Sequence, residues 1–450
     1  ILMSQKIQVK NIRHGNPGLS GWYAILPEPE PTHVLEEELT ADWLIIGGGF
    51  AGLSAARRLL QLREKESIVL LDSIRIGEGS SGRNSGFMID LPHDISSDSY
   101  AGAVERDIRQ TMQNRYAIAF AAKTAEDYGF SQEVFNPCGK INGAASEKGD
   151  RHNREYVVHL NSMGEESTWL DASDMKRITG SDYYLSGLLT PKTVTIQAAA
   201  YVRGFAQSLS RNVNIYENSP VIAMKRAGGI WKVNTPKGSV SAPKVLLCVN
   251  GHLQSFGFLK RRLMHIFLYA SMTRAMTTEE IRRLGGEPSW GVAPANPFGS
   301  SVRKICGVGG HRILVRNKFH FNSTMEASDR DIQRTVRNHD RSFQRRFPML
   351  KNVEMEYRWG GRLCLSWNGV PVFGEIEDGL FAACCQNGVG VSKGTLSGIL
   401  AAEYSSGFQN SYIEDYLNEE QPTRLPPEPI ATMGATAYLN WQEWRAGLEK

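Results

Sequence analysis

Residues 41–60, ADWLIIGGGFAGLSAARRLL, decide the fold. The apolar run before Gly47 predicts a short strand, and the alanine-rich segment that follows predicts a helix with one apolar face. Between them, Gly47, Gly49 and Gly52 match the G-x-G-x-x-G spacing of a dinucleotide-binding turn. The first glycine permits the tight turn, the second admits a pyrophosphate to the backbone, and the third lets helix and strand pack closely. The helix would present free N–H groups to the phosphates from its first turn, which contains Phe50 and Ala51.

A second predicted strand supports this interpretation. Residues 67–73, SIVLLDS, are apolar up to Asp72, and Ser73 follows it. Asp72 lies 20 residues after Gly52, where such folds place a carboxylate that accepts hydrogen bonds from a ribose. The alternative is a glycine-rich turn in an α/β protein that binds no nucleotide. The order of strand, turn, helix and acid favours the dinucleotide site.

The loop after Asp72 indicates which dinucleotide is bound. Residues 74–90, IRIGEGSSGRNSGFMID, contain Gly77, Gly79, Gly82 and Gly86. A nicotinamide-binding domain would normally continue into a second helix soon after its acid. A second loop of small residues suits close main-chain contact with a large flat ring, which points to a flavin.

Length and composition restrict the possible classes of protein. A chain of 450 residues is long enough for two or three domains. A net charge of +4 is too small to indicate a nucleic-acid partner. No apolar run is as long as a membrane span, and none of the six cysteines forms a CxxC pair. We therefore expect a cytoplasmic protein with reduced thiols, and the scattered histidines predict no metal site.

Three blocks of sequence resemble the D-amino acid oxidase superfamily of FAD-dependent amine and amino-acid oxidoreductases, most closely its gamma-glutamylputrescine oxidase-like branch. The first is GWYAILPEPEP followed by DWLIIGGGFAGLSAARRL, and the second is IGEGSSGRNSG. The third, residues 357–403, resembles the family's W-G-G…P-x-x-G signature followed by a glycine-rich turn and a helix. Together the pattern covers most of residues 20–405.

The resemblance implies an α/β fold with a discontinuous cofactor domain. It comprises a Rossmann-like FAD/NAD(P)-binding domain of the glutathione reductase type and an α+β substrate domain built on an antiparallel sheet over the flavin. The expected parts are an N-terminal arm (1–39), the FAD-binding domain (40–97, 195–256 and 357–410), the substrate or cap domain (98–194 and 257–356) and a C-terminal tail (411–450).

The resemblance also implies the residues that surround the cofactor. Val221 would hold the adenine through its main chain, although a core valine is equally expected there. Gly361 would lie beside the flavin, and Val389 stands where the family usually has histidine. The loop along the isoalloxazine would comprise Gly79, Ser80, Ser81, Gly82, Arg83, Asn84, Ser85 and Gly86. The turn at the flavin's pyrimidine edge would comprise Asn387, Gly388, Val389, Gly390, Val391 and Ser392.

The FAD is expected to be non-covalent. Some relatives attach the flavin through a cysteine in the last block, but Cys364 is displaced from that place by a few positions. His93 is a further candidate for attachment or for the substrate pocket, with a lone surface histidine as the alternative.

The same resemblance supplies candidates for contact with substrate or flavin. Arg83 could place positive charge near the flavin, or it could have a structural partner within its loop. Trp359 could lie beside the flavin or in the core. His265 and Tyr269 could contact substrate, or each could be a satisfied polar residue of the sheet. Arg316 stands where many relatives have a small residue; an acidic group on the substrate would explain it, as would a surface salt bridge.

The implied function is oxidation of the C–N bond of an amine or amino acid, with hydride transfer to flavin N5 and hydrolysis of the imine. The expected partners are a small amine and either oxygen or an electron carrier. The first alternative is a dehydrogenase for a D-amino acid, glycine or an N-methyl amino acid that uses a quinone or an electron-transfer protein. A tRNA-modification flavoprotein is disfavoured, because the charge is modest and the chain has no room for an appended transferase domain.

Overall fold

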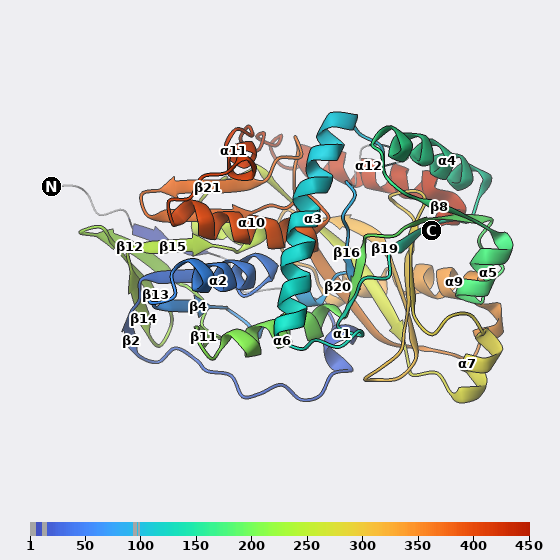
Figure 1. Ribbon diagram of the computed structural model, residues 1–450, viewed down its shortest axis with the longest axis horizontal. Helices are drawn as coiled ribbons and strands as arrows, with labels where there is room; N and C mark the ends of the chain where they lie inside the picture. Colours follow the sequence, from blue (N-terminus) through green and yellow to red (C-terminus); the bar gives the residue numbers. More distant parts are fainter. Residues whose placement is uncertain (1–5, 11–15, 93–96, 98–99) are drawn as a thin grey trace.

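The structure is a computed structural model that describes residues 6–10, 16–92, 97 and 100–450. Two halves lie side by side, and the long helix α3 (Val104–Asp127) runs between them (Figure 1). The first half contains the glycine-rich turn, and the second half is built on a large sheet. Within the described residues, no helix is both long and apolar enough to cross a lipid bilayer.

The first half is organised around a six-stranded sheet in the order β11-β4-β3-β15-β22-β21. Five strands are parallel, and β21 pairs antiparallel at one edge. The four residues of β3 and the four of β4 are all buried, as expected of parallel strands covered on both faces. The strands are β3 (Trp43–Ile46), β4 (Ile68–Leu71), β11 (Asn214–Tyr216), β15 (Lys244–Leu247), β21 (Val372–Glu377) and β22 (Leu380–Cys384).

Each face of this sheet has its own cover. Alternate residues such as Ile45 pack with helices on one face, and Leu44 and Ile46 pack on the other against a second sheet that contains Trp231. The helices are α2 (Phe50–Leu62), α6 (Ala198–Leu209) and α10 (Gly390–Ser405). The second sheet has the order β1-β12-β13-β14-β2, formed by β1 (Lys6–Gln8), β2 (Glu38–Thr40), β12 (Ala223–Ala227), β13 (Ile230–Asn234) and β14 (Ser239–Ala242).

The second half contains an eight-stranded sheet in the order β20-β16-β19-β18-β17-β7-β9-β8. All its pairings are antiparallel except that of β17 with β7. The strands are β7 (Lys140–Ala144), β8 (Thr168–Asp171), β9 (Ser186–Thr190), β16 (Leu263–Thr273), β17 (Trp290–Pro294), β18 (Ser301–Ile305), β19 (Arg312–Phe321) and β20 (Met355–Ser366).

Strand β20 corrects one expected domain boundary. The sequence assigned residues from 357 onward to the cofactor domain, but β20 pairs with β16 over eleven positions and forms the edge of the large sheet. The chain returns to the first half only after Ser366, at β21. The Trp-Gly-Gly signature therefore belongs to the sheet that faces the cofactor domain, because β16 supplies its hydrogen-bonding partner.

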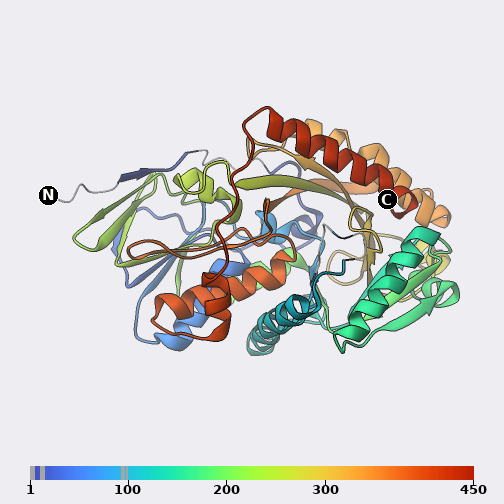
Figure 2. The same ribbon diagram turned by 90° about the horizontal axis from the view of Figure 1, so that it is seen from above.

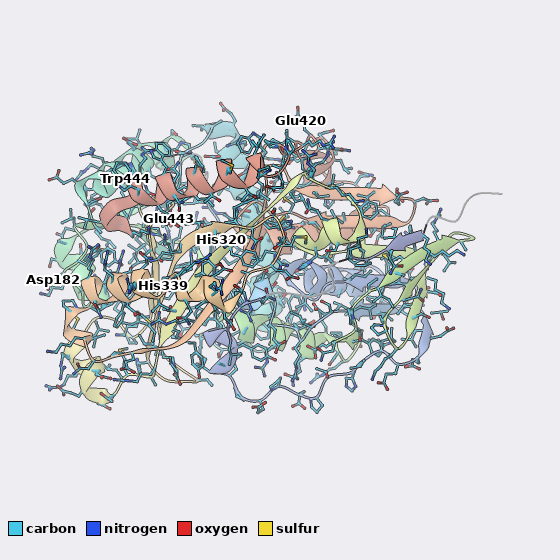
Figure 3. All side chains as sticks on the ribbon, turned by 180° about the vertical axis from the view of Figure 1, so that it is seen from behind. Asp182, His320, His339, Glu420, Glu443 and Trp444 are labelled. Carbon is cyan, nitrogen blue, oxygen red and sulfur yellow. The ribbon has the colours of Figure 1, made fainter. Side chains whose placement is uncertain are left out.

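Helices enclose the large sheet. Helix α12 (Ile430–Ala446) lies along the large sheet (Figures 2 and 3). Its Glu443 accepts a hydrogen bond from Phe319 N of β19 and forms an ion pair with Lys318. His339 belongs to a second helix beside this sheet, α9 (Val336–Arg346) (Figure 3). Helix α8 (Asp329–Gln333) precedes α9 and is separated from it by Arg334 and Thr335. Other elements are α1 (Gly21–Ala24), α4 (Glu147–Ser162), α5 (Ala172–Thr179), α7 (Thr278–Leu284), α11 (Ser411–Leu417) and a small sheet of β5 (Phe87–Met88), β10 (Val194–Ile196) and β6 (Phe135–Asn136).

Candidate active site

The glycine-rich turn joins β3 to α2 at the carboxyl edge of the parallel strands. Gly47 adopts φ +105, a conformation that favours glycine. A Cβ on Gly52 would lie 1.8 Å from Gly47 O, so helix and turn approach too closely for any side chain. Gly49 is the N-cap residue of α2 and has no side chain of its own to cap the terminus, where Phe50 N donates to Ser81 Oγ of the next loop. The turn therefore leaves backbone available to an anionic ligand.

Asp72 lies at the end of β4 beside this turn. Its carboxylate accepts hydrogen bonds from Gly48 N at 2.7 Å and from Ile74 N at 3.0 Å. Burial raises the pKa of Asp72 to about 6, while these two N–H groups act in the opposite direction by stabilising the charged form. The carboxylate is thus fixed in orientation at the position where a ribose is expected.

A cleft that is open to solvent, with an internal volume of about 160 Å³, runs along these elements. Its walls include part of the predicted cofactor set, namely Gly47, Gly49, Asp72, Ser73, Gly79, Ser80, Ser81 and Val221. It continues past β15 to Asn250, Gly251 and His252, and to Arg362 of β20. The cleft therefore joins the glycine-rich turn to the edge of the large sheet, as an extended dinucleotide requires.

The second loop closes onto the first turn and is braced by its own side chains. Ser81 Oγ accepts a hydrogen bond from Phe50 N at 3.3 Å, and Asn84 Nδ2 donates to Ser81 O at 2.7 Å. Asn84 Oδ1 accepts from Gly86 N at 2.8 Å. A Cβ on Gly82 would lie 1.9 Å from Gly77 O, so this loop is also closed too tightly for a side chain at that position. These contacts hold the loop in place against the first turn.

The turn before α10 has an unusual backbone. Asn387, Gly388 and Val389 all have positive φ, and φ is +48 at Val389, a β-branched residue that rarely adopts this conformation. Asn387 fixes the turn: its Oδ1 accepts from Ser366 N at 2.7 Å, and its Nδ2 donates to Val370 O at 2.7 Å. A Cβ on Gly388 or Gly390 would meet no atom within 4 Å, so the turn borders open space. Strain of this kind is common at ligand sites.

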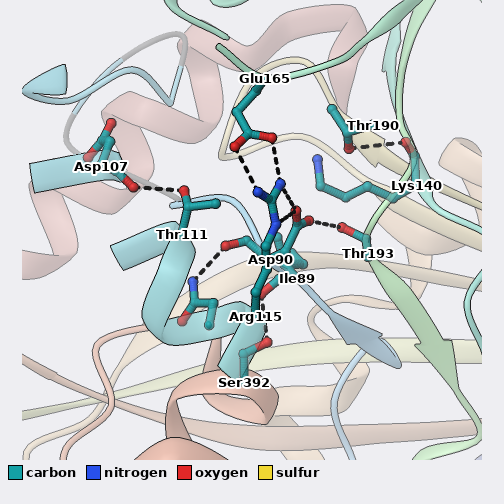
Figure 4. Close-up of polar contacts among 11 residues, drawn as sticks. Ile89, Asp90, Asp107, Thr111, Arg115, Lys140, Glu165, Thr190, Thr193 and Ser392 are labelled. Atoms are coloured by element: carbon teal, nitrogen blue, oxygen red, sulfur yellow. Dashed lines mark hydrogen bonds and ion pairs between the residues drawn. The ribbon is translucent and has the colours of Figure 1, made fainter. Parts of the chain in front are cut away.

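A buried polar cluster links this turn to α3 (Figure 4). Ser392 Oγ donates to Ile89 O at 2.6 Å. The next residue, Asp90, is 1 % exposed; it pairs with Arg115 of α3 at 2.8 Å and accepts from Thr193 Oγ1 at 3.0 Å. Arg115 also pairs with Glu165 at 2.5 Å. The segment after β5 and the start of α10 are therefore held in one network, which the sequence did not reveal.

The comparisons agree with this geometry. Residues 42–404 match the model of the family described as DAO, FAD dependent oxidoreductase. The chain belongs to this family. Its fold and its dependence on FAD, both expected from the sequence, are thereby confirmed.

The individual relatives have low sequence identity to this chain. The chain is 27% identical to a "Probable oxidoreductase OrdL" of Haemophilus influenzae, over 81% of this chain and 82% of the relative. It is 26% identical to the gamma-glutamylputrescine oxidoreductase of Escherichia coli, over 84% of this chain and 86% of the relative. Among solved structures, glycine oxidase from Geobacillus kaustophilus matches with a TM-score of 0.67 at 18% identity. The match covers 86% of this chain and 100% of the glycine oxidase chain.

The residues of the DAO fold present here suit FAD. Asp72 offers fixed carboxylate oxygens to a ribose, and the glycine-rich start of α2 at Gly49 suits close approach of a pyrophosphate to the backbone. Val221 lies in the cleft wall and is also a core residue, so the two expectations for it are compatible. The remaining predicted residues are not part of the walls of this cleft, namely Phe50, Ala51, Gly52, Gly82, Arg83, Asn84, Ser85, Gly86, Gly361, Asn387, Gly388, Val389, Gly390, Val391 and Ser392.

Arg83 and Trp359 form a structural contact between the two halves. Arg83 Nη1 donates to the backbone oxygens of Gly18 at 2.9 Å and Gly360 at 3.1 Å, and Nε donates to Glu78 O at 2.6 Å. Trp359 is fully buried, and its Nε1 donates to Arg83 O at 3.0 Å. These contacts favour the structural alternatives for both residues, because Nε and Nη1 of Arg83 and the indole N–H of Trp359 already donate to backbone oxygens.

His265 and Tyr269 lie on the face of β16 that is turned away from Arg83. His265 Nε2 contacts Gln254 Oε1 at 2.9 Å, and Tyr269 OH contacts His320 Nδ1 at 3.3 Å. Burial lowers the pKa of His265 to about 3 and raises the pKa of Tyr269 well above its ordinary value. Both side chains are thus uncharged at neutral pH, and each has one polar partner. Tyr269 fits the alternative of a satisfied polar residue in the sheet, whereas His265 fits it only through Nε2, because its Nδ1 is buried without a hydrogen-bond partner among the described residues.

Many residues of the cleft wall were not among the candidates, and those nearest the large sheet include Asn250, Gly251, His252 and Arg362. Asn250, Gly251 and His252 follow β15, and a ligand of a parallel sheet lies at the carboxyl ends of its strands. The Asn-Gly pair after a third apolar strand could therefore have indicated from the sequence that these residues line the cleft. Arg362 contacts His252 and Met325 O and lies over the Phe267 ring. Its position depends on the register of β20 with β16, for which the sequence has no local signal.

The environment of Cys364 supports the expectation of non-covalent FAD. Cys364 is 1 % exposed and packs near Gly251 and Cys385. Hydrogen bonding to Cys385 and burial raise the pKa of its thiol well above the ordinary value, so the nucleophilic thiolate is disfavoured. His93, the other attachment candidate, lies outside the described residues.

Proposed function

We propose that this chain oxidises the C–N bond of a small amine or amino acid, in the manner of a gamma-glutamylputrescine oxidase. The observation that supports this most directly is the continuous path from the nucleotide cleft to the edge of the large sheet, which would bring a bound flavin against β20 and the loop of Arg83. Sequence similarity to gamma-glutamylputrescine oxidoreductase and fold similarity to glycine oxidase agree with the reaction class.

The chain's own part in this reaction is orientation and exclusion of water. Bound FAD supplies an acceptor for a hydride equivalent. His265 is neutral and Tyr269 is protonated near pH 7, so neither is suited to take a proton from an ammonium group. We therefore expect the substrate to react as its neutral amine. Positioning by fixed backbone and buried arginines then supplies most of the catalytic advantage.

Flavin bleaching tests the proposal. The purified protein is loaded with FAD, and its visible absorption is followed anaerobically while gamma-glutamylputrescine, putrescine, glycine, sarcosine and D-alanine are added singly. Loss of the oxidised-flavin band with one of them supports C–N oxidation and names the substrate class. Full flavin occupancy with no bleaching by any amine contradicts the proposal.

Readmission of air then distinguishes oxidase from dehydrogenase. Rapid recovery of the oxidised spectrum with formation of peroxide indicates that oxygen is the acceptor. A flavin that stays reduced in air, and is reoxidised by an added quinone, indicates the dehydrogenase alternative. Both outcomes keep the C–N reaction and differ only in the acceptor.

A further inference from the structure

The outer face of helix α12 carries large apolar side chains. The opposite face of the helix is anchored to the large sheet, where Leu439 packs with Ile266 and Phe321. Glu443 of that face accepts a hydrogen bond from Phe319 N. Figure 2 shows α12 along the outer edge of the molecule. The apolar residues of the outer face, each 46–78% exposed, form the α12 stripe; they are Ile430, Met433, Tyr438, Trp441, Trp444 and, in the turn η4 (Gly447–Glu449) that follows, Leu448.

Exposed positions on this face repeat at the spacing of a coiled-coil seam. At alternating intervals of four and three residues, they are Ile430, Gly434, Ala437, Trp441, Trp444 and Leu448. This spacing keeps one side of a helix turned toward a partner helix. It also reads the same from either end, because 430 and 448, 434 and 444, and 437 and 441 are each centred on position 439. An antiparallel copy of the helix, related by a two-fold axis at the level of residue 439, would therefore meet this face in register.

The residues that would face one another across this axis are complementary in size. Trp444 of one copy would lie opposite Gly434 of the other, and Trp441 would lie opposite Ala437. A Cβ on Gly434 would meet no atom within 4 Å, so the surface is open where the partner's ring would enter. A large ring opposite a small residue fills the space between two closely packed helices. The face is therefore complementary to a second copy of itself.

The exposed area of the α12 stripe also suits a second copy. At roughly 200 Å² for a large side chain, the stripe exposes about 700 Å². The largest apolar patch of a typical monomer is smaller, about 300–600 Å². Two copies face to face would bury about 1,400 Å², within the range of roughly 1,200–2,000 Å² for specific protein interfaces. Tryptophan, tyrosine and methionine, which make up most of the stripe, are enriched in such interfaces.

A lipid surface fits this face less well. Helices that lie on anionic membranes carry many lysines and arginines along their polar face. The charged residues from 430 to 450 are Glu443, Arg445, Glu449 and Lys450, which leave no excess of positive charge. Arg445 lies 4.7 Å from the centroid of the Trp441 ring, where its side chain holds that ring rather than extending toward lipid headgroups. Charge therefore favours a protein partner.

We propose that this protein forms a two-fold symmetric dimer through the α12 stripe, with the two α12 helices packed antiparallel. Each copy supplies the same face, so every contact is made twice. Helix α12 lies outside residues 42–404, which match the family model, so the interface is built from an element beyond the matched fold. The dimer does not depend on the proposed reaction.

Analytical ultracentrifugation of the FAD-loaded full chain tests the proposal. Sedimentation over a dilution series gives the mass, in multiples of 50.0 kDa, and the Kd of the dimer. The variants are Trp444→Glu, which places a charge in the interface, and Gly434→Trp, which fills the space expected for the partner's Trp444. Trp367→Glu is the matched control, because Trp367 is 70% exposed on the turn after β20 and lies outside the α12 stripe.

We expect the wild type to be a dimer at micromolar concentrations. Trp444→Glu should raise the dimer Kd at least about 30-fold, since loss of a central tryptophan has effects of this size. Gly434→Trp should raise it at least about 10-fold, because overpacking separates the helices even though the new ring adds apolar surface. A methyl group at 434 should be accepted, since Ala437 occupies the equivalent place opposite Trp441. Trp367→Glu should match the wild type.

Several results would overturn the proposal. They are a wild type that is monomeric at every concentration, a dimer whose Kd neither variant changes, and a dimer that Gly434→Trp tightens, since only a non-specific apolar contact gains from added surface. Circular dichroism checks that each variant folds, and if Trp444→Glu does not, Gly434→Trp decides alone. Co-sedimentation with phosphatidylcholine and phosphatidylglycerol vesicles covers the lipid alternative. A monomer that binds vesicles and loses this binding in Trp444→Glu would contradict the dimer.

Discussion

Gly52 offers a sharp test of the cofactor turn. It lies in the first turn of α2, and helix propensity alone predicts that Gly52→Ala stabilises the helix by up to about 1 kcal/mol. The structure predicts the opposite sign. The added Cβ would lie 1.8 Å from Gly47 O, whereas real Cβ contacts essentially never fall below 3.0 Å, so helix and turn must separate by about 1.2 Å (3.0 − 1.8).

This overlap cannot be relieved by a side-chain rotation, because the contacted atom belongs to the backbone. Overpacking of a rigid site costs roughly 1–3 kcal/mol, and here the upper end applies. After subtraction of the propensity gain, we expect a net loss of roughly 2 kcal/mol in the free energy of unfolding. The FAD affinity should also fall, since the displaced turn no longer presents its N–H groups to the pyrophosphate.

Urea denaturation of the apoprotein and fluorescence titration with FAD measure the two effects. Gly434→Ala is the matched control, because Gly434 is a helical glycine of α12 whose added Cβ meets nothing within 4 Å. That variant should show only the propensity gain, with unchanged FAD binding. If Gly52→Ala proves as stable as Gly434→Ala and binds FAD like the wild type, the steric reasoning about this turn is refuted.

Three further predictions concern other parts of the site. The pKa of Asp72 is about 6 in the apoprotein, and a ribose needs the ionised carboxylate as its acceptor. The affinity for FAD should therefore weaken as the pH falls below about 6, and Asp72→Asn should remove this pH dependence. Fluorescence titrations with FAD at several pH values measure both effects. Trp359→Phe loses one buried hydrogen bond, which should lower the urea midpoint by an amount equivalent to about 1–2 kcal/mol and leave the flavin spectrum unchanged; an altered spectrum would instead place the indole against the ring. Arg115→Met leaves Asp90 buried without its cation and should lower the free energy of unfolding in urea by about 3–5 kcal/mol. Arg154→Met, at an exposed ion pair, should lower it by less than about 1 kcal/mol. Equal losses of stability in the two variants would refute the importance of burial.

Local sequence signals were sufficient for the nucleotide end of the site. The spacing of Gly47, Gly49 and Gly52 and the position of Asp72 follow from backbone geometry within one strand–turn–helix–strand unit. The structure brings these residues to the wall of one cleft. Arg362 reaches the same cleft from a strand almost 300 residues away in the chain (362 − 72 = 290), so no local pattern could have predicted it.

The roles of the sheet residues depended on register, which the sequence does not specify. Alternate residues of a strand point to opposite faces, so a shift of one position exchanges the two faces. The pairing of β16 with β19 contains a bulge between Leu268 and Tyr269. His265 and Tyr269 therefore belong to the face that packs on η2 (Asn250–Phe256) and α8, whereas Arg316 belongs to the other.

The assembly of the six-stranded sheet constrains how the protein acquires its cofactor during synthesis. β3 and β4 leave the ribosome first, but β15 and β22, which complete the sheet beside β3, are made roughly 200 and 340 residues after β3. Helix α10, which covers α2, follows later still. A nascent chain with the glycine-rich turn alone thus has an unpaired strand edge, which favours misassembly and chaperone binding. We therefore expect FAD capture to be a late event in biosynthesis, because a fragment that ends before β22 and α10 lacks part of the sheet and its cover.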